Sequence, residues 1–310
     1  MNDLDPEFTR EILRKVRQLE IRSNRLVSEI FAGSYHSAFR GQGIDFEEVR
    51  EYQPGDEVRS IDWNVTAKTG LPFVKLYREE RELTIMLAVD ISKSSAYGSA
   101  ILSKREKFAE LAALLAFSAC RNGDKVGLLL FTDQTELYLP PTKGQKHVLR
   151  ILREILFRPA LGSGTKLSEG VRMINQVTRK KAVVFLLSDF IFSALSDAEK
   201  DSAKKTLLQE LAYTRIKHDL ICGKIIDPKE HNLPDVGLVK LEDPETGQSC
   251  IIDTGDDQIR QEYKKSFEQM DQKLTKEFKK HGIDQFHLST EEDCSEELLK
   301  FFKVREKRRH

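Results

Sequence analysis

The chain has 310 residues, and its 50 Lys and Arg balance its 50 Asp and Glu, so the formal net charge at pH 7 is zero. A protein that works on nucleic acid or on an anionic membrane surface usually carries a basic excess, and this chain has none overall. Charged residues make up 32% of the chain and hydrophobic residues 39%, which is enough apolar material for one large domain or two small ones.

The sequence gives no sign of a membrane span, a secretory signal or a disulfide framework. No segment stays apolar over the roughly 20 residues that a transmembrane helix needs. The first residues, MNDLDPEFTREILRKVRQLE, contain no apolar signal region. Cys120, Cys222, Cys250 and Cys294 lie too far apart for a CxxC pair or a zinc site. We therefore expect a cytoplasmic protein without membrane insertion.

The N-terminal part predicts a helix followed by an irregular segment. Apolar residues at helical spacing predict one long helix over Pro6–Phe31, which ends just before Gly33. We interpret it as packed on the main domain; a helical arm for a partner is the alternative. From Gly33 to Glu82 the sequence is rich in turns and aromatic residues, with an extended strand expected only over Leu71–Glu80.

From residue 83 onward, predicted strands alternate with predicted helices. Leu83–Val89 and Ala182–Leu187 are continuous apolar runs, which are typical of strands buried on both faces. The other predicted elements are, in chain order, helix Ser103–Arg121, the strand pair Lys125–Phe131 and Leu137–Leu139, helices Lys143–Leu156, Lys166–Thr178 and Lys204–Thr214, strand Asp219–Ile226, edge strand Ser249–Asp253, helix Asp256–Lys280, strand Gly282–Leu288 and helix Ser295–Val304. This alternation predicts an α/β fold with a doubly wound, mostly parallel sheet. The basic tail REKRRH is expected to be a frayed end.

Oxygen-bearing side chains follow the predicted strands at the edge where open parallel sheets bind ligands. Asp90, Ser92 and Ser94 come after LTIMLAV, Asp189 comes after AVVFLL, and Thr165 lies in the glycine-rich turn GSGTK. Carboxylates and hydroxyls are the ligands that hard divalent cations prefer. Each motif alone is common in loops and helix caps, but their order and their shared position at strand ends make the set more specific.

Two patterns in the sequence resemble known families. The order Asp90-x-Ser92-x-Ser94, Thr165, Asp189 resembles the metal-ion-dependent adhesion site of von Willebrand factor type A domains. Upstream, FRGQGIDF from residue 39, REYQPGD from residue 50 and RSIDW from residue 59 resemble the hallmark of domain-of-unknown-function family 58. That bacterial family carries a von Willebrand A-like domain and is usually linked with MoxR-type AAA+ ATPases. Together the two resemblances run from about residue 33 to residue 288.

The resemblance implies a von Willebrand A or Rossmann-like sheet, with Mg²⁺ (or Mn²⁺) bound by the five positions named above. It also implies a protein-interaction role, in which an acidic side chain of a partner completes the metal's shell. We therefore expect a non-enzymatic protein that acts with a MoxR-type ATPase in maturing or remodelling a target protein. We divide the chain into residues 1–82 (N-terminal helix and hallmark segment), 83–290 (the A-like domain with the metal site) and 291–310 (C-terminal helix and basic tail).

The hallmark segment concentrates charged and aromatic side chains. They are Arg50, Tyr52, Asp56, Arg59, Asp62 and Trp63. One interpretation is a structural clamp, in which two opposite-charge pairs and a buried Trp63 pin the segment to the sheet. The other is a docking surface for a partner. Exposed ion pairs contribute only about 0–1 kcal/mol and a buried aromatic ring contributes more, and the sequence leaves both interpretations open.

The enzymatic alternative is a Mg²⁺-dependent hydrolase that uses Asp90 and Asp189. A phosphatase of the haloacid-dehalogenase type needs a second aspartate two residues after the first, where this chain has Ser92. The chain contains no GxxxxGK[ST] phosphate-binding loop, and GSGTK does not have the GxSxG form of a nucleophile elbow. We therefore expect no enzymatic activity.

Overall fold

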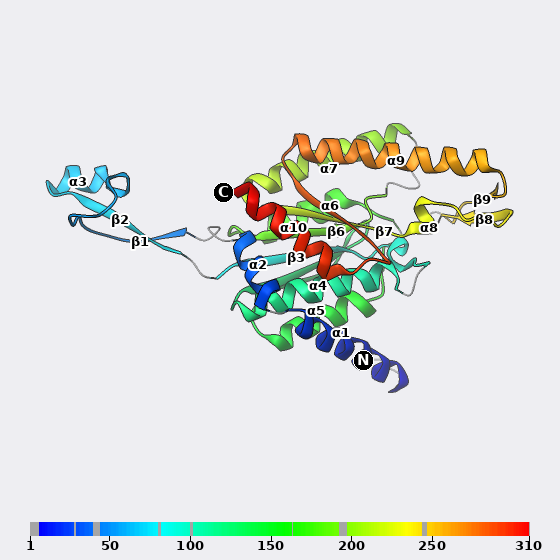
Figure 1. Ribbon diagram of the computed structural model, residues 1–310, viewed down its shortest axis with the longest axis horizontal. Helices are drawn as coiled ribbons and strands as arrows, with labels where there is room; N and C mark the ends of the chain where they lie inside the picture. Colours follow the sequence, from blue (N-terminus) through cyan, green and yellow to red (C-terminus); the bar gives the residue numbers. More distant parts are fainter. Residues whose placement is uncertain are drawn as a thin grey trace.

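A computed structural model of the chain describes residues 6–27, 29–39, 44–79, 82–99, 102–162, 164–191, 197–243 and 247–309. Its centre is a six-stranded sheet with the strand order β10-β7-β6-β3-β4-β5 (Figure 1). The strands are β3 (Thr84–Asp90), β4 (Lys125–Phe131), β5 (Thr135–Thr142), β6 (Val183–Ser188), β7 (Asp219–Ile226) and β10 (Asp284–Ser289). Neighbouring strands pair in parallel, except that β5 is antiparallel to β4.

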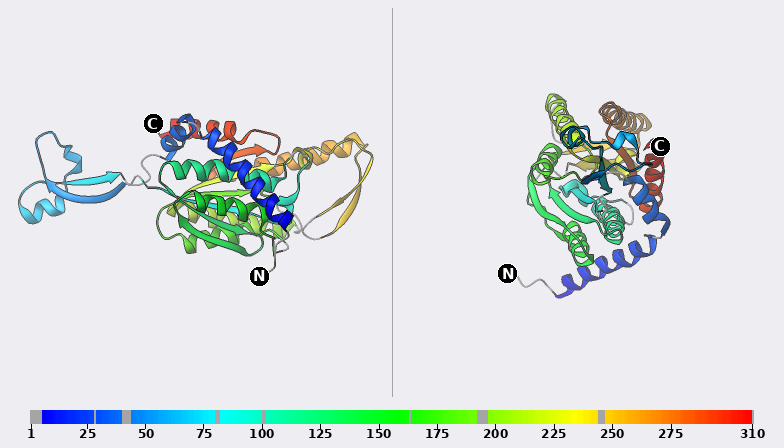
Figure 2. Two further views of the ribbon diagram at one scale, coloured as in Figure 1. Left: turned by 90° about the horizontal axis from the view of Figure 1, so that it is seen from below. Right: turned by 90° about the vertical axis from the view of Figure 1, so that its left-hand side faces the viewer.

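Helices cover both faces of this sheet (Figures 1 and 2). On one face lie α2 (Glu29–Phe39), α4 (Lys104–Arg121), α5 (Gln145–Phe157) and α10 (Cys294–Arg309), with α1 (Pro6–Leu26) packed on α4 and α5; on the other lie α6 (Leu167–Val177), α7 (Asp197–Lys217) and α9 (Asp257–Lys280). Side chains of β3 alternate between the two cores: Ile85 and Leu87 join the first, whereas Met86 and Ala88 join the second. The predicted α/β fold with a doubly wound, mostly parallel sheet is confirmed.

The strand order reverses beside β3. The strand β4 pairs with one side of β3, and β6 pairs with the other side. The carboxyl ends of β3 and β6 therefore flank the topological switch point, where open α/β sheets bind their ligands. Asp90 ends β3 and Asp189 directly follows β6, so the topology brings both predicted carboxylates to this edge.

The N-terminal helical region contains two helices instead of the single helix predicted up to Phe31. Gly33 lies inside α2 and does not follow the last turn, so the predicted end is wrong. The second helix forms because Phe31, Tyr35 and Phe39 recur every four residues and all three rings pack on Phe302 of α10. Burial of this aromatic stripe outweighs the roughly 1 kcal/mol by which glycine disfavours a helix.

Part of the segment predicted to be irregular is a small folded unit, residues 44–79, which we call the hallmark module. It contains β1 (Ile44–Glu51), the 3₁₀ helix η1 (Val58–Ser60), α3 (Trp63–Thr69) and β2 (Phe73–Glu79). The strand β2 was predicted, but β1 and α3 were not. A register shift between Phe46 and Glu48 breaks the two-residue period by which β1 could have been identified. The module precedes the amino end of β3 and projects from the main body (Figures 1 and 2).

A second hairpin lies beyond the carboxyl end of β7, at the other end of the molecule from the hallmark module (Figure 1). There α8 (Pro228–His231) leads to β8 (Leu238–Glu242) and β9 (Ser249–Asp253), which pair only with each other within the described residues. The predicted strand over β9 is present, in this two-stranded sheet and not at the edge of the main one. No described helix is long and apolar enough to cross a membrane.

The helix α10 continues through the tail that we expected to be frayed. Its last described residue is Arg309, and Arg305 is buried beside Leu298 and Phe302 on the inner face of the helix. The guanidinium of Arg305 lies 5.2 Å from the centre of the Phe39 ring. The tail prediction is therefore wrong, because Arg305 belongs to the packed fold. The division of the chain at residues 82 and 290 stays a prediction. Side chains of α2 and α10, which lie on either side of these boundaries, belong to the same hydrophobic core as the sheet.

Candidate functional site

Asp90 is buried at the carboxyl edge of the sheet, where it ends β3. Its Oδ1 accepts a hydrogen bond from the backbone N–H of Ser92 at 2.9 Å, and its Oδ2 accepts the hydroxyl of Ser188 at 2.8 Å. The hydroxyls of Ser92 and Ser94 lie 3.0 Å apart. The short 3₁₀ helix η2 (Lys93–Ala96) follows, in which the Ser95 hydroxyl donates to the Ser92 carbonyl at 2.7 Å. This turn brings Asp90, Ser92 and Ser94 together, as the alternate spacing predicted.

Asp189 reaches the same edge from β6. Its Oδ1 accepts a hydrogen bond from the backbone N–H of Ile191 at 3.1 Å, and its Oδ2 accepts one from the ammonium of Lys104 at 2.7 Å. The next residue, Phe190, has a φ of 54°, which is rare for a bulky side chain. Its buried ring packs edge-on against Phe278 with 5.6 Å between ring centres. The anchored ring fixes the sharp turn after β6 and so holds Asp189 at the strand end.

The charges of the two aspartates interact. Burial, and then the negative charge of Asp189, raise the pKa of Asp90 from 3.8 to about 7. The two residues are only 1% and 4% exposed, so water screens this repulsion little. A bound cation would relieve the repulsion, and the neighbouring Ser92 and Ser94 hydroxyls are further hard oxygen donors. The side chains at this edge therefore fit a divalent metal ion.

Thr165 is half-buried between α5 and α6. The backbone N–H of the next residue, Lys166, donates to the carbonyl of Thr132 at 3.1 Å, just past the end of β4. In the pairing of β4 with β3, Phe131 stands opposite Asp90. The backbone around Thr165 is therefore tied to the same edge of the sheet as the other four predicted ligands.

Three side chains at this edge were not among the predicted site residues. Ser188 holds one carboxylate oxygen, as described above. Lys104 is fully buried, and its ammonium lies 2.7 and 2.9 Å from the two carboxylate oxygens of Glu230 in α8, in addition to its bond with Asp189. Burial lowers the pKa of Lys104, but the negative charges of Asp189 and Glu230 raise it by more, so the net shift of this pKa is upward. A lysine directly after the capping Ser103 is unfavourable, because the amino end of a helix carries partial positive charge. This unusual position is the feature of the sequence that could have identified Lys104.

A metal site at this edge would need ligands other than acidic, histidine or cysteine side chains alone. No cluster of three or more histidine, cysteine or acidic side chains among the described residues could hold a metal ion. A divalent cation here would therefore need oxygen donors in addition to the two aspartates, and the hydroxyls of the Asp-x-Ser-x-Ser turn are such donors.

The hallmark module is fastened by its own contacts. Arg50 and Asp56 form a bidentate ion pair with N–O distances of 2.8 and 2.7 Å, and Asp56 also accepts the backbone N–H of Gln53 at 2.8 Å. The backbone N–H of Tyr52 donates to the carbonyl of Pro72 at 2.8 Å. These bonds tie the turn after β1 to itself and to the start of β2, and none of them reaches the main sheet.

The second opposite-charge pair predicted in the module is wrong. Asp62 does not pair with Arg59; it contacts the ammonium of Lys75 at 3.4 Å. Its carboxylate also accepts the N–H of Asn64 at 2.9 Å and so caps α3. Asp62 is thus a structural residue of the module, while Arg59 is exposed.

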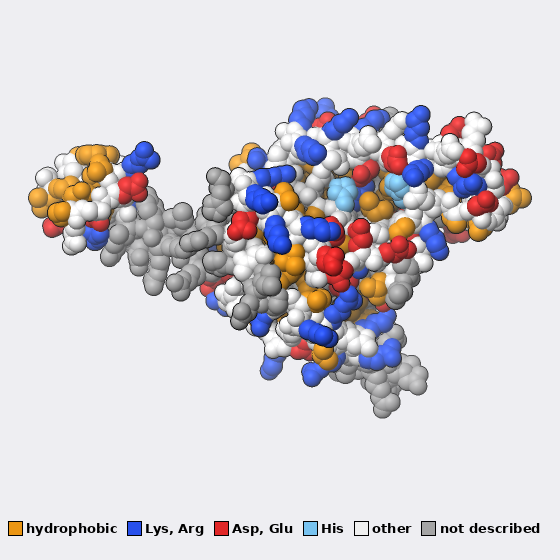
Figure 3. All heavy atoms as spheres, in the orientation of Figure 1, with side chains coloured by type: hydrophobic (Ala, Val, Ile, Leu, Met, Phe, Trp, Pro, Cys, Tyr) orange, Lys and Arg blue, Asp and Glu red, His pale blue; other side chains and the backbone are white. Residues whose placement is uncertain are grey.

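Trp63 is 67% exposed, which contradicts its predicted role as a buried anchor. Val58 and Leu71 are also exposed, at 61% and 54%. In Figure 3 hydrophobic side chains gather on the surface of the module. The tryptophan stays exposed because α3 has seven residues on a two-stranded sheet, and no further layer among the described residues covers it. The interpretation of the module as a docking surface stays a prediction, with which this exposure is consistent.

Replacing Trp63 with alanine is expected to change the free energy of unfolding by no more than about 0.5 kcal/mol, because the side chain is mostly in solvent. Chemical unfolding of the purified protein measures this. The control is Phe108→Ala, which removes a ring that is 1% exposed in the core and should lower the free energy by about 3–5 kcal/mol. A loss above about 2 kcal/mol for Trp63→Ala would restore the anchor interpretation.

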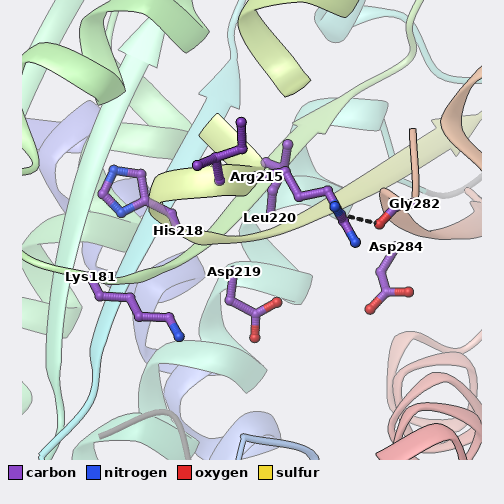
Figure 4. Close-up of a pocket in the computed structure, with 8 residues that line it drawn as sticks. Lys181, Arg215, His218, Asp219, Leu220, Gly282 and Asp284 are labelled. Carbon is purple, nitrogen blue, oxygen red and sulfur yellow. Dashed lines mark hydrogen bonds between the residues drawn. The ribbon is translucent and has the colours of Figure 1, made fainter. Parts of the chain in front are cut away.

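A separate pocket of about 300 Å³ lies at the opposite edge of the sheet, near the starts of β6, β7 and β10 (Figure 4). Its lining residues are Lys181, Arg215, Ile216, His218, Asp219, Leu220, Gly282 and Asp284. Arg215 donates to the Gly282 carbonyl at 2.5 Å, and Arg305 pairs with both acids. Because Asp219 and Asp284 pair with the buried Arg305, these two acids have a structural role. None of the predicted metal ligands lines this pocket.

The fold and the acidic edge together define the class of protein. It is a doubly wound α/β domain with two buried aspartates and two serine hydroxyls at the topological switch point, and with a projecting N-terminal module. A family model described as "Protein of unknown function DUF58" matches residues 48–273, and the chain belongs to this family. The resemblance inferred from the hallmark motifs is thereby confirmed.

Related proteins are similar over much of the chain. An uncharacterized protein of Mycobacterium tuberculosis is 29% identical over 234 residues, which are 75% of this chain and 70% of the relative. An uncharacterized protein of Bacillus subtilis is 26% identical over 107 residues, 34% of this chain and 25% of the relative. An aerotolerance-related membrane protein from Bacteroides fragilis has a TM-score of 0.47 at 17% identity, covering 73% of this chain and 99% of that one. The SpRpn10 VWA domain has a TM-score of 0.31 at 16% identity, covering 47% and 75%. Because both TM-scores are below 0.5, we assign the fold class from the strand order and the helix layers of this chain.

Proposed function

We propose that this protein is a non-enzymatic, Mg²⁺-dependent (or Mn²⁺-dependent) protein-interaction domain. The proposed metal ligands are Asp90, Ser92, Ser94, Thr165 and Asp189. The observation that carries the proposal is the pair of buried carboxylates at the switch point, one of which has its pKa raised to about 7 beside two hydroxyls 3.0 Å apart. Buried like charges are unfavourable unless one of them takes up a proton or a cation joins them.

The surrounding residues prepare the two carboxylates for this role. Ser188 and the Ser92 backbone hold the two oxygens of Asp90, and the turn at Phe190 holds Asp189. When bound, the metal would supply an attachment point for an anionic oxygen from outside the chain. Neutral hydroxyls beside only two carboxylates leave room for such an oxygen, because Mg²⁺ commonly takes outside ligands in its shell.

The partners that we propose follow from the family and from this chemistry. The resemblance to family 58 points to a MoxR-type AAA+ ATPase as the cooperating protein, with maturation or remodelling of a target as the outcome, in the cytoplasm. The target would offer an acidic side chain to the metal. The formal net charge of zero supports a protein partner more than nucleic acid or an anionic membrane surface.

Metal binding and partner binding should be lost together when either aspartate is removed. Asp90→Ala and Asp189→Ala are each expected to weaken Mn²⁺ binding by at least about 100-fold, since loss of residues that merely support a ligand already costs 10–100-fold. Titration calorimetry with Mn²⁺ measures this, and pull-down of a purified MoxR-type ATPase with and without EDTA measures partner binding. Asp124→Ala is a matched control, because Asp124 is a buried aspartate that bonds Tyr35 and Leu83. Equal recovery of the ATPase from wild type and both site variants would contradict the metal-dependent function.

A further inference from the structure

A buried lysine lies against the proposed metal site. Lys104 is 0% exposed, and its ammonium contacts Asp189 at 2.7 Å and Glu230 at 2.7 and 2.9 Å. Its backbone is fixed at the start of α4 by a capping box, in which Ser103 and Glu106 exchange hydrogen bonds. The ammonium of Lys104 thus lies inside the fold, unlike the solvated end of a surface lysine.

The position of Lys104 is unfavourable without these acids. The amino end of a helix carries a partial positive charge that repels a lysine, and a buried ammonium loses its hydration. Asp189 and Glu230 offset both effects. When all are ionised, these two acids and Asp90 carry three negative charges against the one positive charge of Lys104. The net charge of the group is then −2, which one divalent cation neutralises.

We propose that Lys104 is a positioning residue that shares Asp189 with the bound metal and limits the affinity of the site for divalent cations. This inference rests on the proposed function. Two cations that bind the same carboxylate repel each other, and the repulsion is strong where water is excluded. Without the ammonium, the three acids would hold the metal more tightly and keep a net negative charge around it. With Lys104 present, the metal-loaded group is neutral, which favours the approach of an acidic partner.

The test measures Mn²⁺ affinity for the full chain, by the paramagnetic resonance signal of free Mn²⁺ during a titration. Lys104→Met removes the charge and keeps an unbranched side chain, and it should lower the dissociation constant at least about tenfold. Glu230→Gln should raise it at least about threefold, because the site loses a negative charge while Lys104 keeps Asp189. Lys104→Arg retains the charge and should stay within about threefold of wild type.

Lys107→Met is the matched control. Lys107 lies one turn further along α4, is 3% exposed and pairs with Glu110 at 2.9 Å. This variant should be less stable than wild type and should bind Mn²⁺ equally well. If Lys104→Met does not fold, Glu230→Gln decides, and wild-type affinity in that variant overturns the inference.

The outcomes also separate this inference from the proposed function. Equal or weaker Mn²⁺ binding by a folded Lys104→Met protein would show that Lys104 has only a structural role. If wild type does not bind Mn²⁺ but Lys104→Met does, the metal-dependent function is wrong while the inference about Lys104 holds. If neither protein binds Mn²⁺, both are overturned.

Discussion

Replacing Arg305 with methionine is expected to lower the free energy of unfolding by about 3–5 kcal/mol. The Arg305 side chain is only 5% exposed; it bonds Asp284 at 2.8 Å, Asp219 across the base of β7 and the carbonyl of Ala38 at 3.3 Å. Its loss leaves two partly buried carboxylates without this counter-charge, and it removes one contact between α10 and the Phe39 ring. Chemical unfolding followed by circular dichroism measures the change.

Arg308 provides the matched control for this prediction. It lies one turn further along α10, bonds the same Asp284 at 3.2 Å, and has a side chain that is 69% exposed. Arg308→Met should therefore cost no more than about 1 kcal/mol. Equal losses in the two variants would mean that the end of α10 is solvated, as the sequence had led us to expect for the tail.

The main sheet could be predicted because its inner strands are continuous apolar runs and the helices between them have apolar residues at helical spacing. LTIMLAV and AVVFLL are apolar at nearly every position, and a strand covered by helices on both faces requires this. The helix α2 was missed because Gly33, in its first turns, resembled a residue that follows a helix end. The helix forms there because the aromatic rings on either side of this glycine are buried. Burial of these rings depends on Phe302, more than 260 residues away, so no local pattern contains it.

In the candidate site, too, local features of the sequence could be predicted and long-range contacts could not. Asp90, Ser92 and Ser94 could be predicted because they are close in sequence and occupy a recognisable strand end. The contact between Lys104 and Glu230 could not, because the two residues are 126 positions apart and meet only once β3 and β7 are placed in one sheet. Trp63 shows the opposite error: an aromatic residue is buried only where another layer covers it, and its type alone does not decide this.

Without metal, wild type is expected to lose stability relative to Asp90→Asn as the pH rises from about 4 to about 7. The pKa of Asp90 is about 7 in the folded protein and 3.8 ordinarily. The folded state therefore binds the proton more tightly, and this contribution is complete below the ordinary pKa and lost as the pH rises through the folded value. At pH 8 in EDTA, Asp90→Asn should be about 2–4 kcal/mol more stable than wild type.

Asp227 is a matched control whose pKa shift has the opposite sign. It is a buried aspartate at the same edge, after β7; although burial raises its pKa, hydrogen bonds from Ser99, Lys229 and Thr290 lower it below the ordinary value. Its contribution is present at neutral pH and lost as the pH falls, so Asp227→Asn should be less stable than wild type at pH 8. If both variants shift stability in the same direction, the burial and charge assigned to Asp90 are wrong.

Added Mn²⁺ should reverse the pH dependence that Asp90 imposes. A metal ligand must be deprotonated, so the metal binds the ionised form of Asp90 and stabilises the folded protein more as the pH rises. Thermal unfolding of wild type at pH 5 and pH 8, each with EDTA or Mn²⁺, measures this, and the stabilisation by Mn²⁺ should be larger at pH 8. The Asp90→Asn protein should show little stabilisation at either pH. An equal stabilisation of wild type and Asp90→Asn would place the metal elsewhere, because the repulsion between Asp90 and Asp189 is what the cation relieves in the proposed site.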